Sequence, residues 1–435
     1  MQLSNLKLAA FSSPAASIAA LGLPIVIFLP PLYVELGLSL TVVGSVFMIT
    51  RFFDVATDPI FGILGDRINT RWGRRTPALL ISVPLLMYGV YRVFFPPANP
   101  DATDLLVSML ILYVGWTMFT LAHTAWASEL STDYDLRSRI MGTIHFFGLI
   151  GTIVVMLLPV FLDQIAADTT MQDRTAVMGW LILITLPLFS ILAVVSTKEP
   201  QALTHTSLPW RDAVSALVTN RPLRRLLIAD FLLGVQAGIN SSVHFFFVGN
   251  VLHLPSYSSL YLIVLFVSGL AFVPLFLSLS YRIGKHRALA TAVLVTSIGT
   301  VAFFVVPQQS FWITFVVYLF VGVMVGAKDF LMRSIMADVI DQDRVTTGTD
   351  RSALYYSMLT LTAKVGLAAS VGIIYPALDW IGFDPTGANS TETIEAVRIL
   401  AATSPTLLLF LTFVVMWRFP LDKSTQQKLR AKIPA

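Results

Sequence analysis

The stretch LTVVGSVFMITRFFDVATDPIFGIL, residues 40–64, places three charged side chains inside an otherwise apolar run. The run is long enough to cross the hydrocarbon core of a bilayer, which takes roughly 20 helical residues. Arg51, Asp54 and Asp58 are costly at that depth, on the order of 2.5–3.5 kcal/mol for one charge at a helix centre. The stretch therefore predicts a membrane-spanning helix whose charges face a functional site rather than lipid.

Composition extends this prediction to the whole chain. Of its 435 residues, 56% are hydrophobic and 12% are charged, and the mean hydropathy is +0.77. A soluble protein of this length could not cover so much apolar surface. The runs are continuously apolar rather than alternating, which favours helices over a membrane β-barrel. We expect an all-α membrane protein with twelve spans, at residues 8–34, 38–66, 76–96, 103–128, 137–163, 174–196, 224–250, 256–281, 287–307, 310–336, 350–378 and 397–418.

The basic residues predict the orientation in the membrane. Lys and Arg gather between the second and third spans, in the middle loop, between the eighth and ninth spans and in the C-terminal tail. The alternate loops at 96–104, 251–259 and 307–310 contain neither residue. Cytoplasmic loops carry the excess of Lys and Arg, so both termini and the middle loop are expected in the cytoplasm. We explain the net charge of +4 by these loops rather than by nucleic-acid binding.

Two pairs of polar stretches indicate an internal repeat. GDRINTRWGRR (65–75) corresponds to YRIGKHR (281–287), and ELSTDYDLR (129–137) corresponds to DVIDQDR (338–344). Each pair is six spans apart, which predicts two pseudo-symmetric six-helix bundles, the major facilitator architecture. The expected parts are a first bundle, a cytoplasmic middle loop, a second bundle and a cytoplasmic tail, at 1–196, 197–223, 224–418 and 419–435.

The charges of the second span predict an ion site. Arg51, Asp54 and Asp58 share a helical face about 60° wide. Two carboxylates one turn apart can hold a sodium ion together with a hydroxyl such as that of Thr57, or they can share a proton. An Arg51–Asp54 salt bridge that only joins helices is the alternative, but one cation does not neutralise two anions.

Three further embedded charges are candidates for the same transport cycle. Lys364 is predicted as the counter-charge of the two carboxylates, with Arg351 at the cytoplasmic end of its span. Lys328 and Asp329 are interpreted as solute contacts or as partners of charges on other helices. Trp126 is the best stacking platform for a solute, and His145 and Tyr355 are further solute-binding candidates.

The stretch RFFDVATDPIFGILGDRINTRWGRRTP (51–77) resembles the glycoside–pentoside–hexuronide:cation symporters, the melibiose-permease-like branch of the major facilitators. AWASELSTDYDLRSRIMG, MADVIDQDRVTTGTDRSALYYSMLTLTAKVG and GFDP fit the same family in the same order along most of the chain. The resemblance implies that Asp54 and Asp58 bind the coupling cation and that Lys364 communicates with them. It assigns Asp66, Arg67, Gly73 and Arg74 to a cytoplasmic gating motif, to which we add Glu129 and Asp338 from the repeated stretches.

The solute positions differ from the family pattern. Residues that hold the sugar in melibiose permease are replaced here by Ile18, Ala122, His145 and Asp329, whereas Trp126 is retained. Because the position of Ala122 also contributes a carboxylate to the cation site in the family, its loss favours a proton over sodium.

Together these observations predict a cation-coupled symporter, using a proton or sodium, that imports a small polar solute such as a sugar or glycoside by alternating access. A lysolipid transporter of the same fold and a non-transporting membrane sensor are the alternatives. No enzymatic motif, phosphate loop or metal cluster stands out, so neither catalysis nor a cofactor is expected. We expect a monomer surrounded by lipid, in a bacterial inner membrane.

Overall fold

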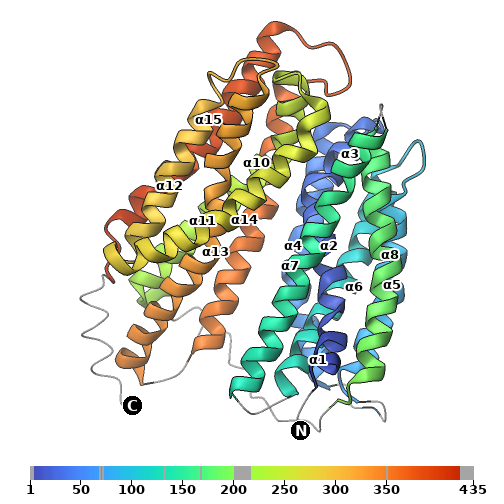
Figure 1. The fold of residues 1–435 in the computed structure, drawn as a ribbon, viewed down its shortest axis with the longest axis vertical. Helices are drawn as coiled ribbons and strands as arrows, with labels where there is room; N and C mark the ends of the chain where they lie inside the picture. Colours follow the sequence, from blue (N-terminus) through green and yellow to red (C-terminus); the bar gives the residue numbers. More distant parts are fainter. Residues whose placement is uncertain are drawn as a thin grey trace. The chain divides into compact units, whose positions relative to one another are not determined.

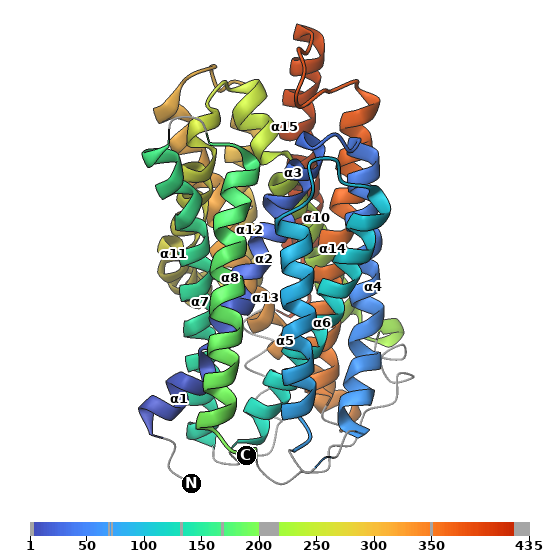
Figure 2. The ribbon, with the colours of Figure 1, turned by 90° about the vertical axis from the view of Figure 1, so that its right-hand side faces the viewer.

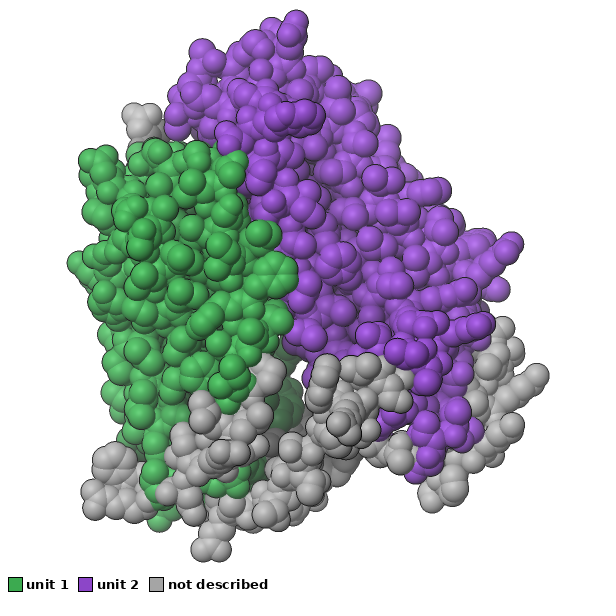
Figure 3. All heavy atoms as spheres, turned by 180° about the vertical axis from the view of Figure 1, so that it is seen from behind, with its two compact units in different colours: residues 1–205 green, residues 206–435 purple. Residues whose placement is uncertain are grey.

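The chain forms two compact units, Met1–His205 and Thr206–Ala435, which Figure 3 shows in green and purple. The computed structural model describes residues 4–67, 70, 73–130, 134–166, 169–199, 217–348 and 351–421, except for some side chains, those of 62–67 among them. Each unit is described by itself.

Unit 1 is a bundle of helices that run alongside one another (Figures 1 and 2). Its helices are α1 (Asn5–Ser12), α2 (Pro14–Ile27), α3 (Leu29–Glu35), α4 (Leu40–Arg67), α5 (Thr76–Phe94), α6 (Ala102–Glu129), α7 (Tyr134–Ile165) and α8 (Met171–Ser196).

The first span is broken into three helices. Pro14 begins α2, and Pro30 and Pro31 lie in the first turn of α3. Proline has no backbone N–H and is favoured in the first turn of a helix, so Pro14, Pro30 and Pro31 lie where the new helices begin, whereas α2 continues past Pro24. The single run expected at 8–34 is correct in position but not continuous.

Unit 2 repeats this arrangement. Its helices are α10 (Arg221–Phe246), the π-helical turn η1 (Phe247–Val251), the short η2 (Pro255–Tyr257), α11 (Ser258–Ile283), α12 (Lys285–Ala302), α13 (Phe311–Thr347), α14 (Ser352–Trp380) and α15 (Thr391–Trp417).

The two units use the same helix pairings. In unit 1, α2 packs on α7 and α8, α6 on α4 and α5, and α5 on α8. In unit 2, the helices six spans later make the same pairs: α10 on α14 and α15, α13 on α11 and α12, and α12 on α15. The repeat seen in the polar stretches is therefore a repeat of the packing itself.

Length and composition make this an integral membrane protein. In the described ranges, eleven helical spans are long and apolar enough to cross a bilayer. The expected span that is not among these eleven is the ninth, α12. It has 18 residues and begins with Lys285, His286 and Arg287, and these polar residues lower its mean hydropathy.

Helix α13 is longer than expected, because the stretch 338–344 is helical rather than a loop. Ile335, Val339 and Ile340 are buried, so the apolar face continues past the expected end at residue 336. Asp338 and Asp343 are buried as well, and each is paired with a basic side chain. These ion pairs allow the charged turn to pack instead of ending the helix.

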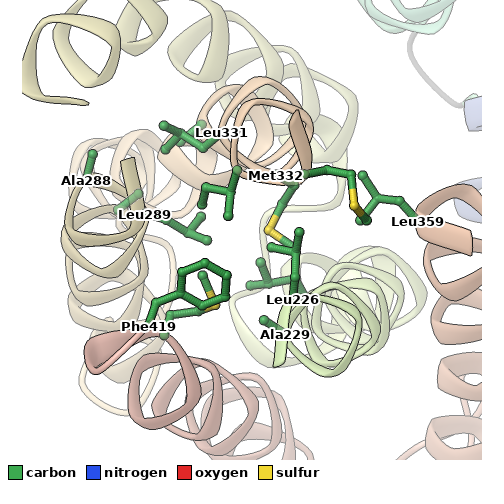
Figure 4. Packing of buried hydrophobic residues seen from close by; sticks show 14 of the residues in the cluster. Leu226, Ala229, Ala288, Leu289, Leu331, Met332, Leu359 and Phe419 are labelled. Carbon is green, nitrogen blue, oxygen red and sulfur yellow. The ribbon is translucent and has the colours of Figure 1, made fainter. Parts of the chain in front are cut away.

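Close packing in unit 2 depends on small residues and on one apolar cluster. Between α11 and α13, a Cβ at Gly326 would lie 1.9 Å from the carbonyl oxygen of Gly269. Small residues let membrane helices approach in this way. Figure 4 shows the cluster in which Leu226, Leu289 and Phe419 meet Leu331 and Met332 of α13.

Candidate functional site

Two carboxylates of α4 meet one hydroxyl of α6. Thr117 Oγ1 lies 2.9 Å from Asp54 Oδ1 and 3.2 Å from Asp58 Oδ1. Asp54 is 4% exposed, and Asp58 is half-buried. Since both carboxylate oxygens touch the same hydroxyl, they are at most about 6 Å apart. A hydroxyl has one proton, so Thr117 donates to one of the two carboxylates at a time.

Thr117 was not among the predicted site residues. It lies in the apolar run VGWTMFTLAHTAW, where a threonine ordinarily donates to its own helix. Thr57, which was predicted, does so: its hydroxyl contacts the carbonyl oxygens of Phe53 at 2.9 Å and Asp54 at 3.1 Å. Its role as a cation ligand stays a prediction.

Arg51 contacts an aromatic ring. Its guanidinium carbon lies 5.1 Å from the centre of the Tyr113 ring on α6, a cation–π arrangement. This contact and the hydrogen bonds of Thr117 join the same two helices, so α4 and α6 together hold the three charges of the opening stretch.

Trp126 lies in an aromatic cluster. It is fully buried, and its ring meets Phe11 edge-on at 5.3 Å between centres. His123 stacks on Phe11 and contacts the carbonyl oxygen of that residue at 2.9 Å. The indole Nε1 of Trp126 has no hydrogen-bond partner within the described part of the chain. Stacking of a solute on Trp126 stays a prediction and requires this cluster to open.

A second charged group lies in unit 2. Asp230 of α10 is 2% exposed, and its Oδ1 lies 3.5 Å from Lys328 Nζ of α13. The hydroxyl of Thr362 on α14 donates to Asp230 Oδ2 at 2.8 Å. One of the two alternatives for Lys328, a partner on another helix, is therefore observed. Asp230 was missed, although a carboxylate in the apolar run LLIADFLLG carries the same signal as Asp54.

The other predicted residues of the solute and charge network are spread over several helices. His145 on α7 and Asp329 on α13 are exposed, and Lys364 on α14 is half-buried. Their roles stay predictions.

Arg351 and Tyr355 belong to a cluster at the start of α14. Arg351 Nε donates to Asp343 Oδ2 at 2.9 Å, and its guanidinium lies 5.9 Å from the centre of the Tyr355 ring. Tyr355 is fully buried, and its hydroxyl accepts from Asn220 Nδ2 at 3.2 Å. A cavity of about 480 Å³, lined by Asn220 and Asp343 among others, adjoins this cluster. The structure thus gives both residues structural partners, and their predicted roles stay untested.

The gating stretch of unit 1 contains a buried ion pair. Arg75 Nη2 lies 2.9 Å from Glu129 Oε1, which joins the start of α5 to the end of α6. Arg74, a predicted member of the gating motif, donates its backbone N–H to Glu199 at 2.7 Å. Glu199 also accepts from the backbone N–H groups of Arg75 and Thr76, so it caps the N-terminus of α5.

The cap formed by Glu199 requires a residue without a side chain at position 73. The φ of Gly73 is 111°, and a Cβ there would lie 2.1 Å from Glu199 Oε2. The side chains of Asp66 and Arg67 lie outside the described residues.

Unit 2 contains the corresponding ion pair. Lys285, at the start of α12, lies 2.7 Å from Asp338 Oδ1 on α13 and also donates to the carbonyl oxygen of Ser334 at 3.0 Å. Gly284 precedes it with φ 92°, as Gly73 precedes the basic pair in unit 1. The two ion pairs are thus repeat-related.

The fold, the repeated ion pairs and the embedded carboxylates define a major facilitator-type membrane transporter. The model of the family "MFS/sugar transport protein" matches residues 10–423, so the chain belongs to this family.

Several curated relatives extend over most of the chain. The glucuronide carrier protein homolog of Escherichia coli is 24% identical over 92% of this chain and 89% of its own length. The isoprimeverose transporter of Lactiplantibacillus pentosus is 21% identical over 89% of this chain and 82% of its own. The sodium-dependent lysophosphatidylcholine symporter 1 of Mus musculus is 21% identical over 90% and 80%.

A solved structure supports the fold. The nucleoside transporter NupG superposes with a TM-score of 0.71 at 14% identity, covering 95% of this chain and 100% of that one.

Proposed function

We propose that this protein is a cation-coupled symporter that imports a small polar solute, a sugar or glycoside, by alternating access. The solute crosses the membrane chemically unchanged, so the activity is transport and not catalysis. The names of the glucuronide carrier and isoprimeverose relatives support a sugar-like solute.

The observation that carries the proposal is the Thr117 bridge between Asp54 and Asp58. Two carboxylates this close repel each other when both are ionised, and the low dielectric of the membrane strengthens the repulsion. A bound proton or sodium ion removes the repulsion. Cation binding can therefore change the relative stability of the arrangements in which α4 packs on α6.

The remaining components follow from this cycle. The coupling ion is a proton or sodium, and the proposed cycle uses no cofactor besides this ion. The transporter acts as a monomer in a bacterial inner membrane, with both termini in the cytoplasm. Arg51, Lys364 and Arg351 are the charges that we assign to the response to the ion.

The test uses purified protein in proteoliposomes. A solute is first found by thermal-shift screening of sugars, glycosides and uronates with and without sodium, since a ligand that binds the folded state raises its melting temperature. Accumulation of that solute is then measured under imposed sodium or pH gradients. Asp54→Asn and Asp58→Asn are expected to abolish gradient-driven accumulation while retaining solute exchange.

Asp101→Asn is the matched control, because Asp101 is an exposed carboxylate before the first turn of α6. It should accumulate solute as the wild type does. If both α4 variants still accumulate solute against its gradient, the carboxylates are not the coupling site.

The similarity to a lysophosphatidylcholine symporter favours one second candidate, transport of an amphiphilic lipid. The same screen separates the two functions. Stabilisation by lysolipids but not by any sugar or glycoside would replace the sugar proposal, while the coupling test at Asp54 and Asp58 stays unchanged.

A further inference from the structure

The charged group of unit 2 is built by three helices and lies outside the α4 ion site. Asp230 on α10 has both carboxylate oxygens engaged, one with Lys328 Nζ at 3.5 Å and one with the Thr362 hydroxyl at 2.8 Å. Its side chain is 3% exposed, whereas that of Lys328 is 16% exposed. Asp230 is thus fixed from two sides, and Lys328 is the more exposed member of the ion pair.

Lys328 lies in the apolar part of α13, about 26 Å along the helix from Phe311 and before the charged turns at 338–344. An ammonium group has three N–H donors, and the contact with Asp230 uses at most one. A buried charged donor without an acceptor is costly, so the exposed side of Lys328 is suited to oxygen acceptors brought by a solute.

The surrounding charges decide which acceptors fit. Asp230 cancels the charge of Lys328, and the exposed Asp329 adds a negative charge at the next position of α13. Lys364 follows Thr362 by two residues and therefore projects about 160° away around α14. Arg333 is exposed and lies about 7.5 Å further along α13. The local net charge is zero or negative, so a solute carboxylate gains little there, whereas neutral hydroxyls gain hydrogen bonds without repulsion.

We propose that Asp230, Lys328 and Thr362 form a solute-binding site for a neutral polyhydroxylated solute. Lys328 donates hydrogen bonds to hydroxyl oxygens of the solute. Asp230 is the positioning residue: it holds the ammonium and cancels its charge, and so it discriminates against anionic solutes such as uronides. The inference rests on the proposed function and narrows its substrate class.

The test compares solutes that differ only in charge. Binding of methyl β-D-glucopyranoside and methyl β-D-glucuronide, and of the corresponding galactoside and galacturonide, is measured at equilibrium on the purified full chain without an ion gradient. The wild type is expected to bind the neutral member of a pair more tightly. Asp230→Asn removes the carboxylate that neutralises Lys328. The ratio of the affinity for the uronide to that for the neutral glycoside should therefore rise about tenfold or more.

Two further variants keep the test decisive. Asp101→Asn removes an exposed carboxylate of unit 1 that is no part of the proposed site, and it should leave the ratio unchanged. The double variant Asp230→Asn with Lys328→Gln removes both members of the ion pair together, so it avoids the instability of neutralising only one of them. It should lose about tenfold in affinity for the neutral solute and gain none for the uronide.

The inference is overturned if the wild type prefers the uronides or binds neither class. It is also overturned if the folded Asp230→Asn variant keeps the wild-type ratio, or if the double variant keeps the wild-type affinity for the neutral solute. The proposed function fails separately, in the gradient assay of the α4 variants, which does not depend on the affinity ratio.

Discussion

Thr117 and Thr57 lie near the same carboxylates but use their hydroxyl protons differently. Thr117 contacts both carboxylates, whereas Thr57 contacts the backbone of its own helix. Thr117→Val is therefore expected to change the half-saturating cation concentration about tenfold, because a hydrogen bond to a charged group contributes roughly 1.5–3 kcal/mol. If the coupling ion is sodium, the half-saturating concentration should rise, because sodium loses an oxygen ligand. If it is a proton, the half-saturating concentration should fall, because the ionised carboxylates lose a hydrogen-bond donor.

Thr57→Val is the matched control for that experiment and should shift the same concentration less than twofold. Uptake against cation concentration in proteoliposomes measures both variants. A large effect of Thr57→Val with none of Thr117→Val would show instead that Thr57 is the ligand, as the sequence predicts.

Single residues could be predicted only where their type was unusual for their surroundings. A carboxylate in an apolar run is such a signal, which is why Asp54 and Asp58 could be selected. Asp230 carries the signal equally and could have been found. Thr117 could not, since its importance depends on the approach of α6 to α4, and threonines in membrane helices mostly bond their own backbone.

At the scale of an element, Gly73 and Glu199 determine how α5 begins. Gly73→Ala places a Cβ on a residue with φ 111° and against the carboxylate of Glu199. Glu199 must then move away from the backbone N–H groups from which it accepts hydrogen bonds. We expect a loss of about 2–3 kcal/mol in stability. Gly348→Ala is the control, because Gly348 has φ 71° but nothing within 4 Å of its Cβ position. It should cost about 1 kcal/mol. Thermal unfolding in detergent measures both, and equal losses would contradict a role for Glu199.

The two repeat-related ion pairs are expected to differ in strength, because they differ in burial. The side chains of Arg75 and Glu129 are 8% and 2% exposed, whereas Lys285 is 30% exposed. Glu129→Gln removes a buried negative charge 2.9 Å from the Arg75 guanidinium and should cost about 3 kcal/mol. Asp338→Asn should cost about 1 kcal/mol, since water can solvate Lys285.

Thermal unfolding of these two variants at low and high salt checks the difference. The effect of Asp338→Asn should become smaller in high salt, because partly exposed pairs are screened. If Asp338→Asn is the more damaging variant, burial does not set the strength of these pairs.

The helices themselves were largely predictable, and the exceptions have local causes. Hydropathy located the spans, but α13 continues past its apolar run because Asp338 and Asp343 are paired with Lys285 and Arg351. A sequence shows that these residues are charged but not that they are neutralised. The breaks in the first span follow its prolines, a signal that length and hydropathy alone do not weigh.

At the scale of the whole molecule, the repeat explains why the weak second-half stretches were informative. The pair Lys285–Asp338 corresponds to the pair Arg75–Glu129, because each joins the third span of its unit to the fourth, although Lys285 directly follows Gly284 and Arg75 is the second residue after Gly73. The residues differ while the charge pattern and the preceding left-handed glycine are kept. Because charge and position correspond although the residues differ, an offset of six spans could be read from degenerate motifs.

The orientation of the molecule gives the last prediction. The chain contains no cysteine, so single cysteines report position without background labelling. Ala98→Cys and Gln308→Cys replace exposed residues in loops without Lys or Arg, whereas Val218→Cys and Arg282→Cys lie beside basic loops. By the positive-inside rule, a membrane-impermeant maleimide should label the first two in intact cells and the last two only after permeabilisation. Because successive spans cross the membrane in opposite directions, the side on which one loop lies determines the sides of all the other loops. Labelling of Val218→Cys in intact cells would place the middle loop outside and overturn the cytoplasmic assignment of both termini.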